Sequence, residues 1–248
     1  MSDSGVIVVS GGGSGIGRAT AERLASDGWP VLIVGRREES LEKVAAGLGD
    51  QVEFLAADVA TESGAALVAA RIEDIRLGCK GVVAAAGGIS PSTDGEQRLD
   101  DVRRDWQAAF ESNVLSAVLL VEALREDLEQ GGGRVVLLSS VAALRGSGGG
   151  PYGAMKAALH AWVFDLAREL GRHGGTANVV APGFVPDTEF WADRLTDELR
   201  RERAGQTLIG REGFPEEIAS LISWLLGPHG GWMTGQVLSP NGGVVLGR

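Results

Sequence analysis

The chain contains a single tyrosine, Tyr152, and a lysine stands four positions after it at Lys156. Only three lysines occur in the whole chain, so chance is a poor explanation of this spacing. Pro151 follows a glycine run and precedes a stretch rich in Ala, Leu and Met, which predicts the start of a helix. Positions four apart lie on one face of a helix, so we expect the phenol and the amine to be neighbours. An adjacent ammonium lowers the pKa of a phenol, which suits the phenol to proton transfer near neutral pH.

The segments that must position this pair alternate regularly along the chain. Apolar, β-branched runs typical of buried strands lie at residues 6–10, 31–35, 52–57, 81–86, 134–140, 176–182 and 235–240. Stretches with helical periodicity lie at residues 16–27, 38–47, 62–74, 101–128, 152–171, 187–203 and 215–226. This alternation predicts an α/β fold, a Rossmann-type doubly wound parallel sheet of about seven strands with helices on both faces. We expect a single domain over 1–248, with a cofactor half at about 1–135 and a catalytic and substrate half at about 136–248.

A glycine-rich stretch follows the first predicted strand and opens the first predicted helix. Gly11, Gly15 and Gly17 stand at this turn, together with Ser14 and Ile16. A dinucleotide pyrophosphate needs backbone N–H groups, a helix N-terminus and no side chain in the way, and a strand, a glycine loop and a helix supply all three. The pattern therefore predicts a dinucleotide site, with a plain tight turn as the alternative.

The end of the second predicted strand indicates which dinucleotide is preferred. The position where an acidic residue would bind the ribose 2′-hydroxyl of NAD holds Gly35, and Arg36 and Arg37 follow it. A guanidinium is the natural bidentate partner of a 2′-phosphate, so the sequence favours NADP(H) over NAD(H). The alternative is that both arginines only occupy a loop, with Glu38 and Glu39 as favourable carboxylates in the first turn of the next helix.

Composition and charge argue against several classes of partner. The 248 residues carry a formal net charge of −10 and a pI near 4.9, so neither nucleic acid nor an anionic membrane is an expected partner. No apolar run reaches the length of a membrane span, and the N-terminus shows no basic region or cleavage site, so we expect a cytoplasmic protein. Cys79 is the single cysteine, and the three histidines are scattered and expected at surface or helix-end positions, so no metal site is predicted.

Taken together, these motifs resemble the classical form of the short-chain dehydrogenase/reductase family over the whole chain. The stretch "SGGGSGIG" is similar to the family's pattern T-G-x-x-x-G-x-G, with Ser10 in place of threonine, and "NVVAPG" and "TGQVLSPNGG" resemble two further family segments. The resemblance implies that the catalytic residues are Asn113, Ser140, Tyr152 and Lys156. Together with the glycine and arginine patterns, it implies cofactor contacts at Gly11, Ser14, Gly15, Ile16, Gly17, Arg36, Arg37, Asp58, Val59, Ala85, Gly87, Tyr152, Lys156, Pro182, Gly183 and Val185.

Two features depart from the family's pattern. Its N-N-A-G motif after the fourth strand appears as "AAAG" at 84–87, so the asparagine side chain that normally braces the central sheet is missing. The loop between the serine and the tyrosine looks one residue shorter than usual, which places Ser139 at the customary distance of 13 residues before Tyr152. We favour Ser140 because it fits the "SSVA" context and follows Asn113 by 27 residues, the family's common interval. Ser139 remains the alternative.

The segment after "APG" is expected to form a lid at about 184–206, as the resemblance implies. Phe184, Phe190 and Trp191 give this lid an apolar face, which suggests a substrate with hydrophobic bulk; the alternative is that they anchor the lid to the body. No cluster of Lys or Arg marks a carboxylate or phosphate pocket on the substrate side. Arg145 is the one candidate cation for a substrate contact, with a solvent-facing position as the alternative. The family resemblance implies that the substrate is a small carbonyl or alcohol compound, with a thioester-linked compound among the candidates.

The resemblance implies an NAD(P)(H)-dependent oxidoreductase acting on CH–OH and C=O groups. We favour NADPH-dependent reduction of a ketone to a secondary alcohol, with a 3-oxoacyl-thioester or polyketide-type carbonyl as substrate. The alternatives are an alcohol dehydrogenase acting on free ketones, steroids or secondary-metabolite alcohols, and a non-catalytic dinucleotide-sensing protein. The family also implies a homotetramer built through the helices at about 101–128 and 152–171. Trp106, Trp162 and Trp224 are expected to serve packing.

Overall fold

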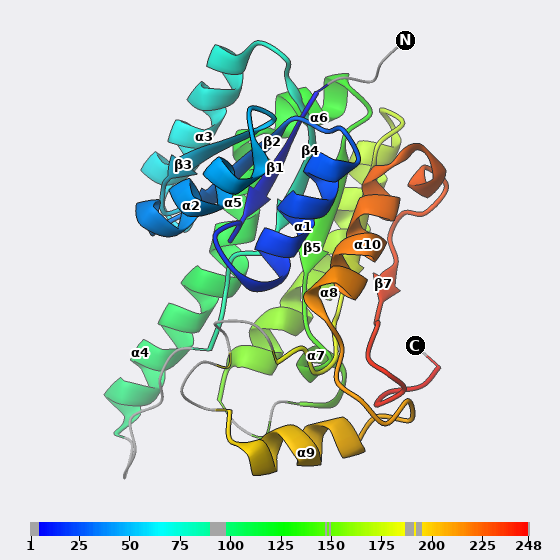
Figure 1. Cartoon of the computed structure of the whole chain (residues 1–248). Helices are drawn as coiled ribbons and strands as arrows, with labels where there is room; N and C mark the ends of the chain where they lie inside the picture. Colours follow the sequence, from blue (N-terminus) through cyan, green and yellow to red (C-terminus); the bar gives the residue numbers. More distant parts are fainter. Residues whose placement is uncertain are drawn as a thin grey trace.

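A single central sheet runs through the computed structural model, which describes residues 5–89, 98–146, 148, 150–186, 191 and 195–247 (Figure 1). Its strands are β1 (Val6–Ser10), β2 (Val31–Gly35), β3 (Val52–Ala56), β4 (Cys79–Ala84), β5 (Arg134–Leu138), β6 (Thr176–Val180) and β7 (Val237–Leu238). The helices are α1 (Gly15–Ser26), α2 (Glu38–Leu48), α3 (Glu62–Ile75), α4 (Leu99–Phe110), the π-helical turn η1 (Glu111–Leu115), α5 (Ser116–Ala123), α6 (Arg125–Gln130), α7 (Ala142–Arg145), α8 (Tyr152–Gly171), α9 (Asp197–Gly205), α10 (Pro215–Leu226) and the 3₁₀ turn η3 (Pro228–Gly230).

The strand order is β3-β2-β1-β4-β5-β6-β7, and every neighbouring pair is parallel. From β1 the chain builds the sheet outward through β2 to β3, and it then returns to place β4 on the other side of β1. The strand β1 therefore pairs with β2 on one side and with β4 on the other. Ligands of open α/β sheets bind beyond the carboxyl ends of the strands at such a point. The predicted doubly wound parallel sheet of seven strands is therefore confirmed, whereas the domain limits of 1–248 and the two functional halves stay predictions.

Successive side chains of the strands pack against helices on opposite faces of the sheet. In β1, Val8 belongs to a core shared with α3, α5 and α8, whereas Ile7 and Val9 belong to a core shared with α1, α2 and α10. Figure 1 shows α1 and α10 side by side on one face. Because both faces are covered, the strands must be almost continuously apolar, which is why they are recognisable in the sequence.

The expected helix over 101–128 is not continuous, so this prediction is wrong. After α4 the chain enters the π-helical turn η1, where the side-chain amide of Asn113 donates to the Ala109 carbonyl at 3.0 Å. Such a side chain competes with the backbone for a helical carbonyl, and π-helical turns often occur at functional sites. A second break follows at Leu124, whose φ of −111° and ψ of 10° separate α5 from α6.

Other boundaries also differ from the expectation. β5 ends at Leu138 and not at 140, β7 covers only part of 235–240, and the short helix α7 has no predicted counterpart. Of the helix expected over 187–203, the structure describes α9, which continues to Gly205. Residues 187–190 and 192–194 lie outside the described residues.

Candidate active site

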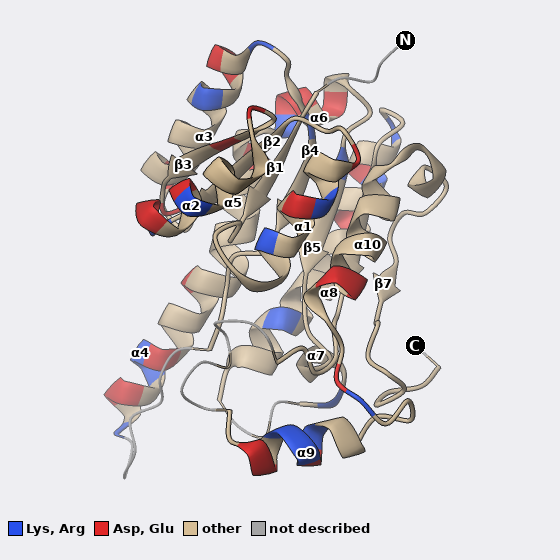
Figure 2. Ribbon diagram, in the orientation of Figure 1, with Lys and Arg blue, Asp and Glu red and all other residues tan. Residues whose placement is uncertain are grey.

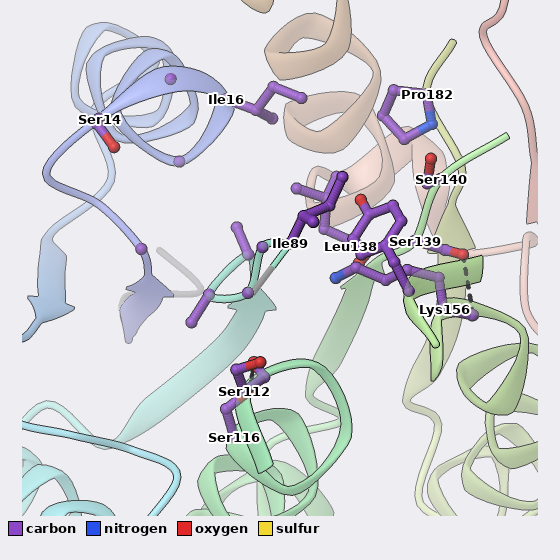
Figure 3. A pocket seen from close by; sticks show the side chains of 18 of the residues that line it. Ser14, Ile16, Ile89, Ser112, Ser116, Leu138, Ser139, Ser140, Lys156 and Pro182 are labelled. Carbon is purple, nitrogen blue, oxygen red and sulfur yellow. Dashed lines mark hydrogen bonds between the residues drawn. The ribbon is translucent and has the colours of Figure 1, made fainter. Parts of the chain in front are cut away.

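A cleft of about 910 Å³ lies at the carboxyl ends of the strands (Figure 3). The predicted residues that line it are Gly11, Ser14, Gly15, Ile16, Gly17, Arg36, Arg37, Asp58, Val59, Ala85, Gly87, Ser140, Arg145, Tyr152, Lys156, Pro182, Gly183, Phe184, Val185 and Trp191. Asn113 is buried behind the cleft wall, and Phe190 lies outside the described residues. The topology of the sheet thus gathers residues from almost the whole length of the sequence in one cleft.

The loop between β1 and α1 approaches itself so closely that glycine is required. Gly11 and Gly15 have φ values of 69° and 50°, and a Cβ on Gly17 would lie 2.3 Å from the Gly11 carbonyl oxygen. The side chain of Ser14, which precedes the helix, makes no capping hydrogen bond to it. The N-terminus of α1 therefore lies beside a backbone cradle free of obstructing side chains, which fits the pyrophosphate of a dinucleotide.

Charged side chains mark the end of the cleft beyond β2 and β3. Arg36 and Arg37 follow the last residue of β2, Asp58 follows β3, and all three are exposed. The Asp58 carboxylate accepts the backbone N–H of Ala60 at 3.1 Å, which fixes its orientation. An exposed guanidinium directly after β2 fits the 2′-phosphate of NADP better than the free hydroxyl of NAD.

Tyr152 and Lys156 lie one turn apart on α8 and both face the cleft. The amine of Lys156 donates to the Leu138 carbonyl at 2.9 Å and lies 6.0 Å from the centroid of the Tyr152 ring, as the sequence spacing led us to expect. Burial disfavours the charged amine and lowers its pKa from 10.5 to about 8. The amine therefore remains mostly protonated at neutral pH, and an ammonium at this distance stabilises a phenolate.

The two candidate serines differ in what their hydroxyls contact. Buried Ser139 donates to the Lys156 carbonyl at 3.0 Å and lies 2.8 Å from Nε2 of His160, so it fastens the end of β5 to α8 (Figure 3). The half-buried hydroxyl of Ser140 accepts the backbone N–H of Ala142 at 3.1 Å. This bond leaves the Ser140 proton available for a substrate oxygen, so the geometry favours Ser140. The surface or helix-end position expected for His160 is wrong, because this residue is half-buried within α8.

Asn113 connects the π-helical turn to the loop after β4. Its side-chain amide donates to the Gly88 carbonyl at 2.9 Å, and its side-chain oxygen accepts the Gly88 N–H at 3.0 Å. A Cβ on Gly87, whose φ is 141°, would lie 2.6 Å from the Asn113 side-chain oxygen and 3.0 Å from Nζ of Lys156. Gly87 is therefore the point at which Asn113 and Lys156 approach the same backbone.

Ser10 supplies a brace in the region where "AAAG" replaces the family's asparagine motif. Its hydroxyl is buried at the end of β1 and accepts the backbone N–H of Ala86 at 3.1 Å. The same oxygen lies 3.5 Å from the Val83 carbonyl. The hydroxyl that occupies the family's threonine position thus ties β1 to the loop after β4.

The remaining end of the cleft combines apolar and polar groups. The rings of Phe184 and Trp191 form an edge-to-face pair with centroids 5.2 Å apart, and both line the cleft. Arg145 is exposed, and its guanidinium donates to the side-chain oxygen of Gln206 at 2.9 Å. This end therefore offers an apolar wall with polar groups from α7 and α9 beside it.

Several residues that line the cleft were not singled out from the sequence. Ile89 follows β4 and Leu138 ends β5, so the rule that ligands bind beyond strand ends is a signal that could have indicated them. Arg203 and Gln206 fall within the lid expected at about 184–206, but nothing in the sequence distinguished them within that segment, because the tertiary packing decides which side chains of α9 reach the cleft.

Comparison with known proteins agrees with this geometry. Residues 11–245 match a family model described as enoyl-(acyl carrier protein) reductase. The short-chain reductase protein NovJ of Streptomyces niveus is 34% identical over 98% of this chain and 95% of NovJ. The 3-oxoacyl-[acyl-carrier-protein] reductase FabG of Vibrio cholerae is 32% identical over 97% of each chain. Among solved structures, the Pseudomonas aeruginosa RhlG/NADP active-site complex matches with a TM-score of 0.87 and 29% identity, covering 97% of this chain and 96% of that chain.

The parallel sheet and the cleft at its switch point define a dinucleotide-binding α/β enzyme. The chain belongs to the short-chain dehydrogenase/reductase family, and it is an oxidoreductase that acts on C=O and CH–OH groups with a nicotinamide cofactor. In the part of the chain that the structure describes, no helix is both long and apolar enough to cross a bilayer. Nor do the described residues contain a group of three or more His, Cys, Asp or Glu side chains arranged to hold a metal ion.

Proposed function

We propose that the protein uses NADPH to reduce a 3-oxoacyl-thioester or polyketide-type ketone to a secondary alcohol. The observation that carries this proposal is the convergence of Tyr152, Lys156 and Ser140 in the cleft that also contains the glycine loop. NovJ is named a short-chain reductase and FabG a 3-oxoacyl reductase, which supports the reaction class. The RhlG structure is a complex with NADP, which supports the nucleotide choice inferred from Arg36.

Each catalytic side chain has a distinct task in this reaction. NADPH supplies the hydride when it is bound. Tyr152 donates its phenolic proton to the carbonyl oxygen, which becomes the hydroxyl of the product. Lys156, as an ammonium, lowers the pKa of Tyr152, and its amine is held by the Leu138 carbonyl. Ser140 donates a hydrogen bond to the same substrate oxygen and orients it.

Asn113 acts behind these groups. Both polar atoms of its side chain are bonded to Gly88, so the loop after β4 is held in one place beside Lys156. We assign Asn113 the role that the family resemblance implies, which is to help a water molecule return protons to Lys156. The position of Gly87 between the two side chains supports this assignment.

The decisive experiment measures NADPH consumption at neutral pH with an acetoacetyl thioester and, in parallel, with a bulky cyclic ketone. We expect faster turnover of the thioester, and a repeat with NADH should be slower. Turnover of the cyclic ketone alone would favour the alternative, an alcohol dehydrogenase acting on free ketones. Tight NADPH binding without turnover of either compound would contradict the proposal and favour a dinucleotide-sensing protein.

We further propose a cytoplasmic homotetramer. The packing predicted for Trp106 and Trp224 is wrong within one protomer, because these side chains are 45% and 44% exposed, whereas Trp162 packs against the core. Phe110 lies one turn after Trp106 on α4, and Phe164 on α8 is also exposed, so the two helices implicated in assembly carry unburied rings. Sedimentation velocity at micromolar concentration should show a tetramer, and a 25.8 kDa monomer would contradict it.

A further inference from the structure

Arg203 on α9 lines the cleft and has a buried nitrogen, Nε, with no hydrogen-bond partner among the described residues. Its neighbours on the same helix are bonded. The guanidinium of Arg200 is bonded to the Glu212 carboxylate, and Nε of Arg201 donates to the Asp197 carbonyl at 3.2 Å. Because Nε is enclosed by protein atoms, a bound molecule would contact the terminal nitrogens of the Arg203 guanidinium, which are not buried and have no hydrogen-bond partner among the described residues.

Arg145 approaches the same helix from α7. Its guanidinium donates to the side-chain oxygen of Gln206 at 2.9 Å, and both residues line the cleft. Gln206 follows Arg203 by three positions at the end of α9, so these two side chains lie on the same face. The bond between Arg145 and Gln206 therefore brings a second guanidinium to the face of α9 that carries Arg203. Figure 1 shows α9 below α7 at this end of the molecule.

Among the described residues, Arg145 and Arg203 together with the Glu202 carboxylate leave a small excess of positive charge at this end of the cleft. Among the described residues that line the cleft, the carboxylates are Asp58, which follows β3, and Glu111, in η1. Neither belongs to α7 or α9. Gln206, which Arg145 contacts, is neutral, and its side-chain amide donates to the carboxylate of Glu202, an α9 residue outside the cleft lining, at 3.0 Å. Although α9 carries charges of both signs (Figure 2), Arg203 makes no ion pair with a described residue. Two guanidinium groups from α7 and α9 in the described lining of the cleft fit an anionic ligand.

We propose that Arg203 and Arg145 form an oxyanion subsite that binds a phosphate or carboxylate group on the substrate, away from the reacting carbonyl. A guanidinium binds either group in bidentate geometry, and the apolar pair of Phe184 and Trp191 lines the same cleft. The substrate is therefore an amphiphilic ketone with one anionic group. This inference rests on the proposed reductase function and adds Arg203 to Arg145, the cation expected to reach a substrate.

Matched substrates separate the two sources of the oxyanion. The first pair is acetoacetyl-4′-phosphopantetheine and acetoacetyl-pantetheine, which differ only in the phosphate of the carrier arm. The second pair is the N-acetylcysteamine thioester of a 3-oxo-dicarboxylic acid and its terminal methyl ester, which differ in a carboxylate on the acyl chain. We expect the anionic member of one pair to have a kcat/KM about tenfold higher, mainly through a lower KM. The pair that shows the preference identifies the source of the oxyanion.

Substitutions then assign the preference to the two arginines. Arg203→Gln and Arg145→Gln should bring the ratio of kcat/KM for the anionic substrate to kcat/KM for the neutral substrate close to one, mainly through a higher KM for the anionic substrate. Arg203→Lys keeps the charge and should retain part of the preference. The matched control is Arg201→Gln on the same helix, because Arg201 is exposed and does not line the cleft. Because Arg145 is exposed, its variant tests the subsite even if Arg203→Gln fails to fold.

The outcomes distinguish this inference from the proposed function. Reduction of both members of each pair with equal kcat/KM would overturn the subsite and leave the reductase function intact. A preference that persists in both Gln variants would also overturn it. If no thioester is reduced, the proposed function fails, and calorimetric titration with 4′-phosphopantetheine, pantetheine and the free 3-oxo-dicarboxylate still tests the subsite. Binding of an anion that is lost in Arg203→Gln would support it, and no difference between wild type and variant would overturn it.

Discussion

The amine of Lys156 lies 6.0 Å from the centroid of the Tyr152 ring and donates to the Leu138 carbonyl at 2.9 Å. One helical turn of α8 sets the distance between the amine and the ring. The packing of α8 against the end of β5 brings the amine to the Leu138 carbonyl. The lysine is thereby buried at the cleft wall with its charge beside the phenol. In the proposed mechanism, this arrangement places the proton donor beside the cation that lowers its pKa.

Replacing Tyr152 by phenylalanine tests the proton donor. We expect Tyr152→Phe to lower kcat for ketone reduction by at least about 10²-fold, because the substrate oxygen loses its proton source. The affinity for NADPH, measured by fluorescence titration, should change little, since the ring remains. A variant that retains wild-type turnover would remove Tyr152 from the mechanism.

The lowered pKa of Lys156 predicts a pH dependence of stability. The folded-state pKa of about 8 lies below the ordinary value of 10.5, so between these values the unfolded chain binds more protons than the folded protein. The Lys156 contribution to the free energy of unfolding therefore rises with pH across this window and is constant below it. Buried Cys79, with a pKa raised from 9.0 to about 12, has the opposite effect above pH 9.

Comparison with Lys156→Met isolates the lysine, because Cys79 is present in both proteins. We expect the unfolding free energy of wild type minus that of Lys156→Met to increase from pH 8 to pH 10.5. The slope should be at most about 1.4 kcal/mol per pH unit. Urea denaturation at several pH values measures it. A difference that is independent of pH would show that burial does not lower the lysine pKa.

The two serines should respond differently to alanine substitution. Ser140→Ala should lower kcat by about 10²-fold or more, because a hydrogen bond to the substrate oxygen is lost. Ser139→Ala should instead cost about 1–3 kcal/mol of stability, because it leaves buried partners on α8 unsatisfied, and should retain most of the activity. Steady-state kinetics and thermal unfolding of both variants decide between them. The reverse pattern would make Ser139 the catalytic serine.

Arg36 is expected to select the nucleotide. Arg36→Asp should reverse the preference for NADPH over NADH, with a change of at least about tenfold in the ratio of kcat/KM values, because a carboxylate repels the 2′-phosphate. Arg172→Asp, at an exposed position just after α8, introduces the same charge change away from the cleft and serves as the control. An unaltered ratio in Arg36→Asp would show that Arg36 does not contact the nucleotide.

Local features of the sequence predicted much of the fold and part of the site. The glycine loop, the arginines after β2 and the Tyr152–Lys156 pair each depend on neighbouring residues, so their spacing carries the information. The two breaks in the helix expected over 101–128 were missed. One occurs where the Asn113 side chain bonds the Ala109 carbonyl and Gly88, a residue of a distant loop.

By itself, the amino-acid sequence determined the α/β class, the alternating order of strands and helices and the family, because apolar periodicity and short motifs are local properties. Only the tertiary structure decided which serine hydroxyl is bonded to α8 and that Arg203 and Arg145 line the same cleft. These outcomes depend on how α8 and α9 pack against distant segments. Contacts between residues far apart in the chain leave no periodic signal, so the arrangement of the substrate end emerges only when the chain is folded.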